Sequence, residues 1–116
     1  MKRYTHSHEW MTLQGNVGTV GITHHAQKEL GEIVFIELPK IGQMLQVGKE
    51  ACILESTKAA IDIYSPASGK VIAVNEALRQ VPASLHQTAE TTGWLYRLEL
   101  SNPREWDLLL SCEQKH

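Results

Sequence analysis

The chain has 116 residues, enough for one domain that buries roughly two-thirds of the surface of its unfolded chain. Hydrophobic residues make up 42% and charged residues 21%, the composition of an ordinary globular protein. The formal charge of −2 and the pI near 6.3 argue against a nucleic-acid-binding surface. No apolar run approaches the roughly 20 residues that a membrane helix requires.

Nothing near the N-terminus predicts export from the cell. Residues Met1–His6 include two cations with no apolar stretch behind them, so they do not form a secretory signal. We therefore expect a single domain over residues 1–116, located in the bacterial cytoplasm and monomeric, with neither nucleic acid nor a membrane as its partner.

The first third of the chain predicts a hairpin followed by a short helix. Two strand-like runs, Glu9–Leu13 and Val17–Ile22, are separated by a three-residue turn sequence containing glycine. Thr23 is a residue type that caps helices, and it precedes a helical segment over His24–Leu30. A glycine, Gly31, directly follows this segment and is expected to end the helix.

The remainder of the chain predicts mostly strands. A strand over Glu32–Leu38 would place Ile33 and Phe35 on one face, and Pro39 would end it. Turn residues then recur at short intervals, which is the spacing of an all-β sandwich or barrel. The other strands are expected at Gln43–Gln46, Glu50–Glu55, Ala60–Tyr64, Lys70–Val74 and Trp94–Leu100.

Two helical segments are expected in the second half of the chain. Residues Asn75–Leu78 predict one helical turn. Asn102 is a capping residue followed by a proline, which predicts the start of a last helix. We expect that helix to run through Trp106 and Leu108–Leu110 and to stop by His116.

Lys58 is the most informative residue of the sequence. It lies in the polar link Glu55–Ala60, between the apolar runs Ala51–Leu54 and Ile61–Tyr64. This pattern predicts a hairpin with the lysine exposed at its tip, and glycines frame the hairpin ten residues before and eleven after the lysine. An exposed lysine on a rigid hairpin is what an enzyme needs to attach a cofactor without unfolding the chain.

Other patterns of chemical function are missing from the sequence. Cys52 lies in an apolar run and is expected to be buried, while Cys112 near the C-terminus is expected to be partly exposed. The cysteines have no CxxC spacing, and the six histidines form no HExxH or Cys/His cluster. We therefore expect neither a metal site nor catalytic residues.

Segments from Tyr4 to about Leu110 resemble the H protein family of the glycine cleavage system. Each segment is weak evidence alone, but their order and spacing extend over nearly the whole chain. The segments are Ser7-His8-Glu9-Trp10, Val20-Gly21-Ile22-Thr23, Ala26-Gln27, Leu30-Gly31, Phe35-Ile36-Glu37-Leu38-Pro39, Glu55-Ser56-Thr57-Lys58-Ala59-Ala60, Asp62-Ile63-Tyr64, Pro66, Ser68-Gly69, Val74-Asn75-Glu76-Ala77-Leu78 and Gly93-Trp94-Leu95.

The resemblance implies a mainly β, barrel-sandwich hybrid fold of the lipoyl- and biotinyl-domain type. A short helix in the N-terminal half and a C-terminal helix accompany the strands in this fold. The resemblance also implies that lipoate is bound covalently to Lys58. A biotin carrier shares the architecture, but its lysine usually lies between methionines, whereas Thr57 and Ala59 flank Lys58 here.

The function implied by the resemblance is that of a non-catalytic carrier in glycine catabolism. A lipoyl-lysine swinging arm takes the aminomethyl group of glycine from a pyridoxal phosphate-dependent decarboxylase to a folate-dependent aminomethyltransferase. Dihydrolipoyl dehydrogenase then reoxidises the arm, which a lipoyl ligase or transferase first attaches. Attachment makes the Lys58 ammonium a neutral amide, which removes the cost of burying a charge.

The resemblance also implies roles for four other residues. Ser7, Glu9 and Asp62 would form the cleft that receives the arm, where carboxylates hold the positive charge of the aminomethyl amine. Glu55, three residues before the lysine, would be recognised by the lipoylating enzyme. Without the resemblance, these carboxylates would be interpreted as ordinary solvated residues of strands.

Departures from the family pattern leave other functions open. They occur at Arg79–Pro82, at Thr88–Thr92 and at Ile61. One alternative is an H-like lipoyl donor, from which lipoate is relayed to 2-oxoacid dehydrogenases. Another is a redox-linked lipoyl carrier outside glycine cleavage, and a third is an unmodified scaffold.

Overall fold

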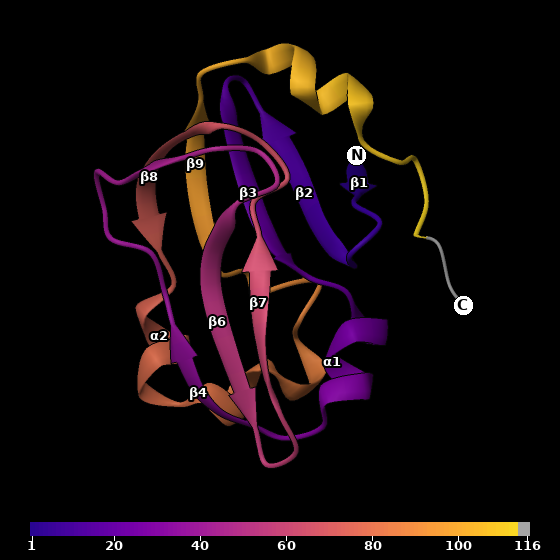
Figure 1. Ribbon diagram of the computed structural model, residues 1–116, viewed down its shortest axis with the longest axis vertical. Helices are drawn as coiled ribbons and strands as arrows, with labels where there is room; N and C mark the ends of the chain where they lie inside the picture. Colours follow the sequence, from indigo (N-terminus) through magenta and orange to yellow (C-terminus); the bar gives the residue numbers. More distant parts are fainter. Residues whose placement is uncertain (114–116) are drawn as a thin grey trace.

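A computed structural model describes residues 1–113, and it consists mainly of antiparallel strands in two sheets (Figure 1). The six-stranded sheet has the order β1-β2-β3-β9-β8-β5, and the three-stranded sheet has the order β4-β6-β7. The strands of the first sheet are β1 (Lys2–Tyr4), β2 (Glu9–Gln14), β3 (Val17–Ile22), β9 (Tyr96–Leu100), β8 (Gly69–Val74) and β5 (Met44–Leu45). Those of the second are β4 (Ile33–Glu37), β6 (Glu50–Ser56) and β7 (Ala60–Tyr64).

Side chains from both sheets pack into one hydrophobic core. Leu54 on β6 and Ile63 on β7 are buried in the same cluster as Val20 on β3 and Leu98 on β9. Burial alternates along β6, as expected for a strand with one face on the core and one in solvent. The arrangement confirms the prediction of a mainly β, barrel-sandwich fold.

Short helices close the ends of the sandwich. Helix α1 (His24–Leu30) begins where the Thr23 hydroxyl accepts the N–H of Ala26 at 3.1 Å and ends at Gly31, whose φ is 80°. Helix α2 (Glu76–Gln80) and the 3-10 helix η1 (Pro82–Gln87) pack near β4. Among the described residues, no helix has both the length and the apolar character needed to cross a membrane.

The prediction that Ile33 and Phe35 lie on one face of the strand is wrong. The register of β4 against β6 shifts between these residues, which is the mark of a β-bulge with Val34 as the extra residue. Ile33 and Ile36 are therefore buried, while Val34 is 50% exposed and Phe35 is 49% exposed. A bulge reverses the side-chain alternation, so the sequence pattern placed Phe35 on the wrong face.

The prediction of a last helix running through Leu110 is also wrong. A 3-10 helix, η2 (Pro103–Leu108), forms after the Asn102 cap, and the chain is then extended at Leu109. Leu110 forms a bridge with Tyr4, in which each backbone N–H donates to the other residue's carbonyl at 2.8–2.9 Å. This pairing with the N-terminal segment replaces the helix, and the remaining expected helical residues, 114–116, lie outside the described part. Strand β1 and helix η1 were not predicted.

Close packing of β2 on β3 positions the N-terminal residues of the candidate site. Trp10 is opposite Gly21 in the ladder, and its indole N–H donates to the Ala89 carbonyl at 2.8 Å. A Cβ atom on Gly21 would lie only 2.6 Å from the Trp10 ring. The indole thus occupies the space that a side chain at position 21 would need, directly beside the Glu9–Ile22 pair.

We expect Gly21→Ala to lower the free energy of unfolding by about 2 kcal/mol, because the methyl group overpacks a buried ring. Urea unfolding followed by tryptophan fluorescence measures the change. Ile72→Ala, which shortens an exposed side chain, is the control and should change the stability by less than about 0.5 kcal/mol. A Gly21→Ala midpoint equal to that of the unaltered protein would contradict the packing described here.

Candidate functional site

The turn between β6 and β7 holds Lys58 away from the sheets. Its backbone closes through the N–H of Ser56, which donates to the Ala59 carbonyl at 2.8 Å. The Ser56 hydroxyl oxygen in turn accepts the backbone N–H groups of Lys58 and Ala59, both at 3.1 Å. One side chain therefore satisfies two backbone donors of the turn and fixes its conformation.

The Lys58 side chain is exposed and lies beside the end of α1. Its Cε and Nζ atoms are 3.8 and 3.9 Å from the point where a Cβ on Gly31 would lie. The lack of a side chain at Gly31 leaves this side of the lysine open. Residues Thr57–Ala60 are all exposed as well, so an enzyme can reach the amine without separating the strands.

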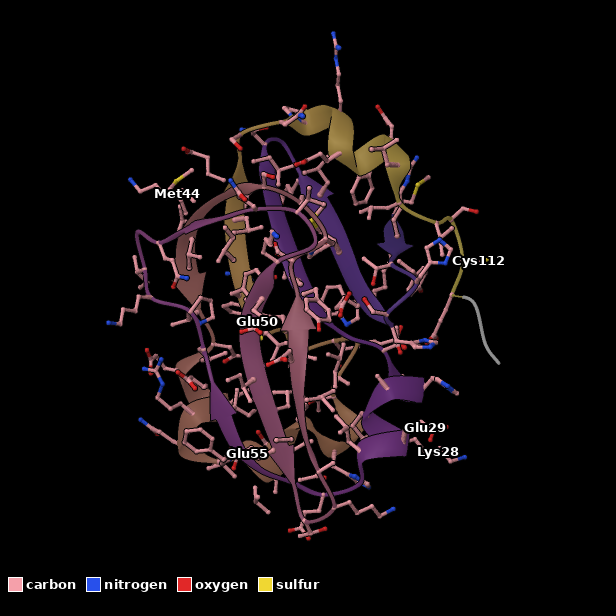
Figure 2. All side chains as sticks on the ribbon, in the orientation of Figure 1. Lys28, Glu29, Met44, Glu50, Glu55 and Cys112 are labelled. Carbon is pink, nitrogen blue, oxygen red and sulfur yellow. The ribbon has the colours of Figure 1, made fainter. Side chains whose placement is uncertain are left out.

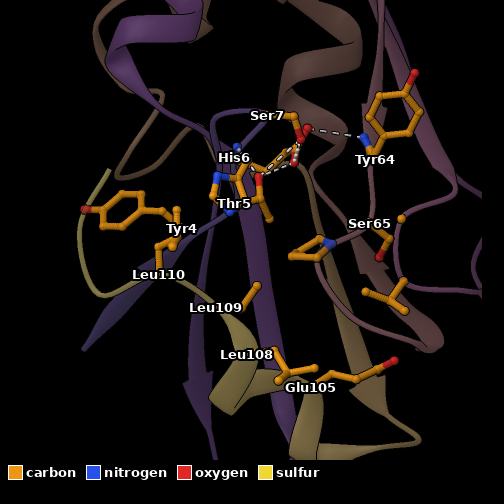
Figure 3. A pocket seen from close by; sticks show the side chains of 14 residues that line it. Tyr4, Thr5, His6, Ser7, Tyr64, Ser65, Glu105, Leu108, Leu109 and Leu110 are labelled. Atoms are coloured by element: carbon orange, nitrogen blue, oxygen red, sulfur yellow. Dashed lines mark hydrogen bonds between the residues drawn. The ribbon is translucent and has the colours of Figure 1, made fainter. Parts of the chain in front are cut away.

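A buried carboxylate lies near the opposite end of β7. Glu9 is 1% exposed, and its carboxylate accepts hydrogen bonds from the Ser7 hydroxyl at 2.6 Å and from the Thr5 hydroxyl. The backbone N–H of Tyr64 donates to its second oxygen at 3.3 Å (Figure 3). Since β7 extends about 13 Å from Ala60 to Tyr64, the strand sets the separation between the hairpin turn and this carboxylate.

Burial raises the pKa of the Glu9 carboxyl above its ordinary value of 4.5. The hydrogen bonds from Ser7, Thr5 and Tyr64 lower the pKa, but they do not cancel the desolvation of the charged form. Such a carboxylate is stabilised by any further donor that carries a positive charge, and an ammonium group is the simplest donor of that kind.

Ser7 and Glu9 line a pocket of about 260 Å³ (Figure 3). Its other walls come from the β1–β2 link, the loop that precedes β6, the end of β7 with the two residues after it, and the segment that follows β9. The closing apolar side chains are those of Leu108–Leu110. The complete lining is Tyr4, Thr5, His6, Ser7, Glu9, Val47, Gly48, Tyr64, Ser65, Pro66, Glu105, Leu108, Leu109 and Leu110. The pocket is therefore mainly apolar, with a carboxylate on one side.

The structure brings some of the predicted site residues together and leaves others apart. Ser7 and Glu9 are directly hydrogen-bonded. Asp62 is exposed on β7, two residues before Tyr64 and on the same face of the strand, so its Cα is about 7 Å from that of Tyr64. Glu55 is exposed at the hairpin end of β6, opposite Ala60. Asp62 and Lys58 do not line the pocket.

Three contributors to the site were not identified from the sequence. They are the hydroxyls of Thr5 and Ser56 and the backbone N–H of Tyr64. Ser56 stands two residues before Lys58, and a serine often bonds to backbone groups two or three residues ahead, so its role had a local signal. Tyr64 is 55 residues from Glu9, and no local pattern links the two.

Residues 2–116 match the protein family described as "Glycine cleavage H-protein". The chain belongs to this family. The match spans both sheets, the β6–β7 hairpin, and Glu9 with its hydrogen-bond partners.

Relatives and a solved structure agree with this membership. A "Glycine cleavage system H protein" of Beijerinckia indica subsp. indica is 48% identical over 108 residues, which cover 93% of this chain and 87% of that protein. The protein of the same name from Thermotoga maritima is 44% identical over 110 residues, which cover 95% of this chain and 89% of that protein. A crystal structure of a glycine cleavage system H protein from Mycobacterium marinum superposes with a TM-score of 0.81 at 35% identity, over 86% of this chain and 84% of that one.

The raised pKa of Glu9 predicts a pH dependence of stability. The folded state binds the Glu9 proton more tightly than the unfolded state does, so the resulting stabilisation is complete below pH 4.5 and is lost as the pH rises through the folded-state pKa. Glu9→Gln removes this titration, while the hydroxyls of Ser7 and Thr5 can rotate to accept from the amide. We expect Glu9→Gln to become progressively more stable relative to the unaltered protein between pH 4 and 7, as measured by urea unfolding. A constant or opposite difference over this range would contradict the assigned burial effect.

Proposed function

We propose that the chain is a non-catalytic lipoyl carrier of the glycine cleavage system, with lipoate bound through an amide to Lys58. The observation that supports this most strongly is the exposed Lys58 amine in a fixed hairpin turn, in a chain of the glycine cleavage H-protein family. The relatives named above are bacterial, which favours the same setting for this chain. We propose that it acts in the cytoplasm as a monomer.

The residues around Lys58 fit a long acyl group. The amine is accessible, the adjacent Gly31 has no side chain to obstruct it, and Ser56 keeps the turn closed whichever way the arm points. Acylation removes the charge of the amine. The substituted side chain can then lie against apolar surface without burying an ammonium group.

When bound, the lipoyl group supplies a cyclic disulfide that is reduced as it accepts the aminomethyl group derived from glycine. The chain's own residues provide the electrostatic complement to the amine of that group. Glu9 offers a buried carboxylate, oriented by Ser7, Thr5 and the backbone of Tyr64. Asp62 adds an exposed carboxylate on β7, two residues before Tyr64. Glu9 and Asp62 thus supply one buried and one exposed carboxylate to hold the positive charge.

Four kinds of enzyme are the partners of a carrier of this type. A pyridoxal phosphate-dependent glycine decarboxylase loads the arm, a folate-dependent aminomethyltransferase unloads it, and dihydrolipoyl dehydrogenase reoxidises it. A lipoyl ligase or transferase acylates Lys58, and Glu55 on the same hairpin is exposed where that enzyme would recognise it.

Exchange of bicarbonate with the carboxyl group of glycine, catalysed by the decarboxylase, tests the proposal. We expect the lipoylated chain to support exchange and Lys58→Arg to reduce it to the background without carrier, because the arginine keeps the charge but cannot form the amide. Lys70→Arg, which alters an exposed strand lysine, is the control and should support full exchange. Exchange with Lys58→Arg would contradict the proposal, and a lipoylated chain without exchange would favour the lipoyl donor or the redox carrier.

The cleft residues predict how long the loaded state survives. We expect Glu9→Gln and Asp62→Asn each to shorten the lifetime of the methylamine-loaded protein by roughly tenfold, since each removes one charge-assisted interaction with the amine. Release of formaldehyde over time measures the lifetime. Asp107→Asn, at an exposed carboxylate outside the cluster, should leave it unchanged. Equal lifetimes in all four proteins would remove Glu9 and Asp62 from the cleft.

A further inference from the structure

The outer face of the three-stranded sheet surrounds the base of the Lys58 hairpin. The strand register places Phe35, Glu55 and Ala60 in one row across β4, β6 and β7. The row that lies next to it on this face contains Glu37, Ile53 and Asp62. All of these side chains except the half-buried Ile53 are exposed. We call the five residues Phe35, Glu37, Ile53, Glu55 and Asp62 the hairpin face.

The β-bulge at Val34 gives this face its large apolar side chain. Regular alternation from Ile33 would point Phe35 into the core, but the register shift turns it outward instead, where it is 49% exposed. Ile36 then takes the inward position and is 2% exposed. Bulges commonly serve to re-aim a side chain at a functional surface. An exposed phenyl ring set by such a device has no role in the core.

The hairpin face is also strongly acidic. The strands β4, β6 and β7 contain four carboxylates, at Glu37, Glu50, Glu55 and Asp62, and no lysine, arginine or histidine. Figure 2 labels Glu50 and Glu55 along β6, on the sheet turned toward the viewer. The four carboxylates give these strands a formal charge of −4, and the whole chain has a formal charge of −2. The rest of the chain therefore carries a formal charge of +2. Lys49 directly precedes β6, and Lys58, whose charge acylation removes, lies in the turn between β6 and β7.

We propose that the hairpin face is the docking surface for the glycine decarboxylase, with the Phe35 ring as its apolar anchor and the carboxylates as its charged rim. The proposal rests on the carrier function proposed above. The enzyme surface that fits is basic, with an apolar recess for the ring beside the channel that admits the arm. An apolar anchor within a polar rim is the usual anatomy of a protein interface.

The chemistry of the arm favours the decarboxylase as the occupant. This enzyme receives the oxidised arm, which is neutral and offers only a cyclic disulfide and an alkyl chain. The decarboxylase therefore has to recognise the carrier through contacts with the surface of the carrier itself. Lys58 lies in the turn between two strands of this sheet, so an enzyme that takes in the arm approaches the hairpin face.

Kinetics of the exchange reaction with lipoylated variants test the docking surface. We expect Phe35→Ser to raise the KM for the carrier about tenfold with kcat within about twofold, because an anchor residue contributes to association and not to the chemical step. Ile72→Ser is the matched control, since Ile72 is 39% exposed and also lies at a bulge, in the other sheet. Its KM should equal that of the unaltered protein. Only the lipoylated fraction, measured by intact mass, is counted as carrier.

The charged rim is tested by salt dependence. We expect Glu37→Gln to weaken the rise of KM with ionic strength, while Glu99→Gln, at an exposed carboxylate of the six-stranded sheet, should leave that dependence unchanged. Unaltered KM values for Phe35→Ser with an active parent protein would overturn the docking surface and leave the carrier function intact. A change confined to reoxidation by dihydrolipoyl dehydrogenase would also overturn it. Failure of the lipoylated parent protein to support any exchange would overturn both proposals.

Discussion

The closed turn between β6 and β7 is the constraint on which the proposed role of the protein depends. Both strands anchor the turn in the core, through Leu54 on one side and Ile63 on the other, while Ser56 satisfies the backbone donors at the tip. A rigid support with one long, flexible side chain at its end allows wide movement of that side chain without movement of the fold. The roles proposed for most of the other site residues depend on their distance from this turn.

Strand β7 links two chemically different ends of the molecule. An accessible amine precedes it, and at its far end the backbone of Tyr64 contacts a carboxylate that is withdrawn from water. Burying Glu9 is unfavourable for the isolated chain, as the raised pKa of its carboxyl indicates. The folded protein tolerates the buried carboxylate because three hydrogen-bond donors contact it, and a bound cation would stabilise it further. The arrangement supports the proposed role of Glu9 in holding a positive charge.

The sequence predicted those features that depend on neighbouring residues. The Thr23 cap, the glycine that ends α1 and the hairpin around Lys58 follow from local patterns, and all three are present. The site assignments of Ser7, Glu9 and Asp62 came from family resemblance, and the structure joins Ser7 to Glu9 by a hydrogen bond.

What the sequence did not predict depends on contacts between distant segments. The bulge at Val34 is a matter of register between β4 and β6, so alternation alone placed Phe35 on the same face as Ile33. Leu110 pairs with Tyr4 at the other end of the chain, which no helix propensity reflects. The Tyr64 contact to Glu9 is equally non-local.

The most direct test is the mass of the protein isolated from the cells that make it, followed by peptide mapping. The account predicts one added lipoyl group, located on Lys58 and on no other lysine. A population that is wholly unmodified, or one acylated elsewhere in the chain, would contradict it.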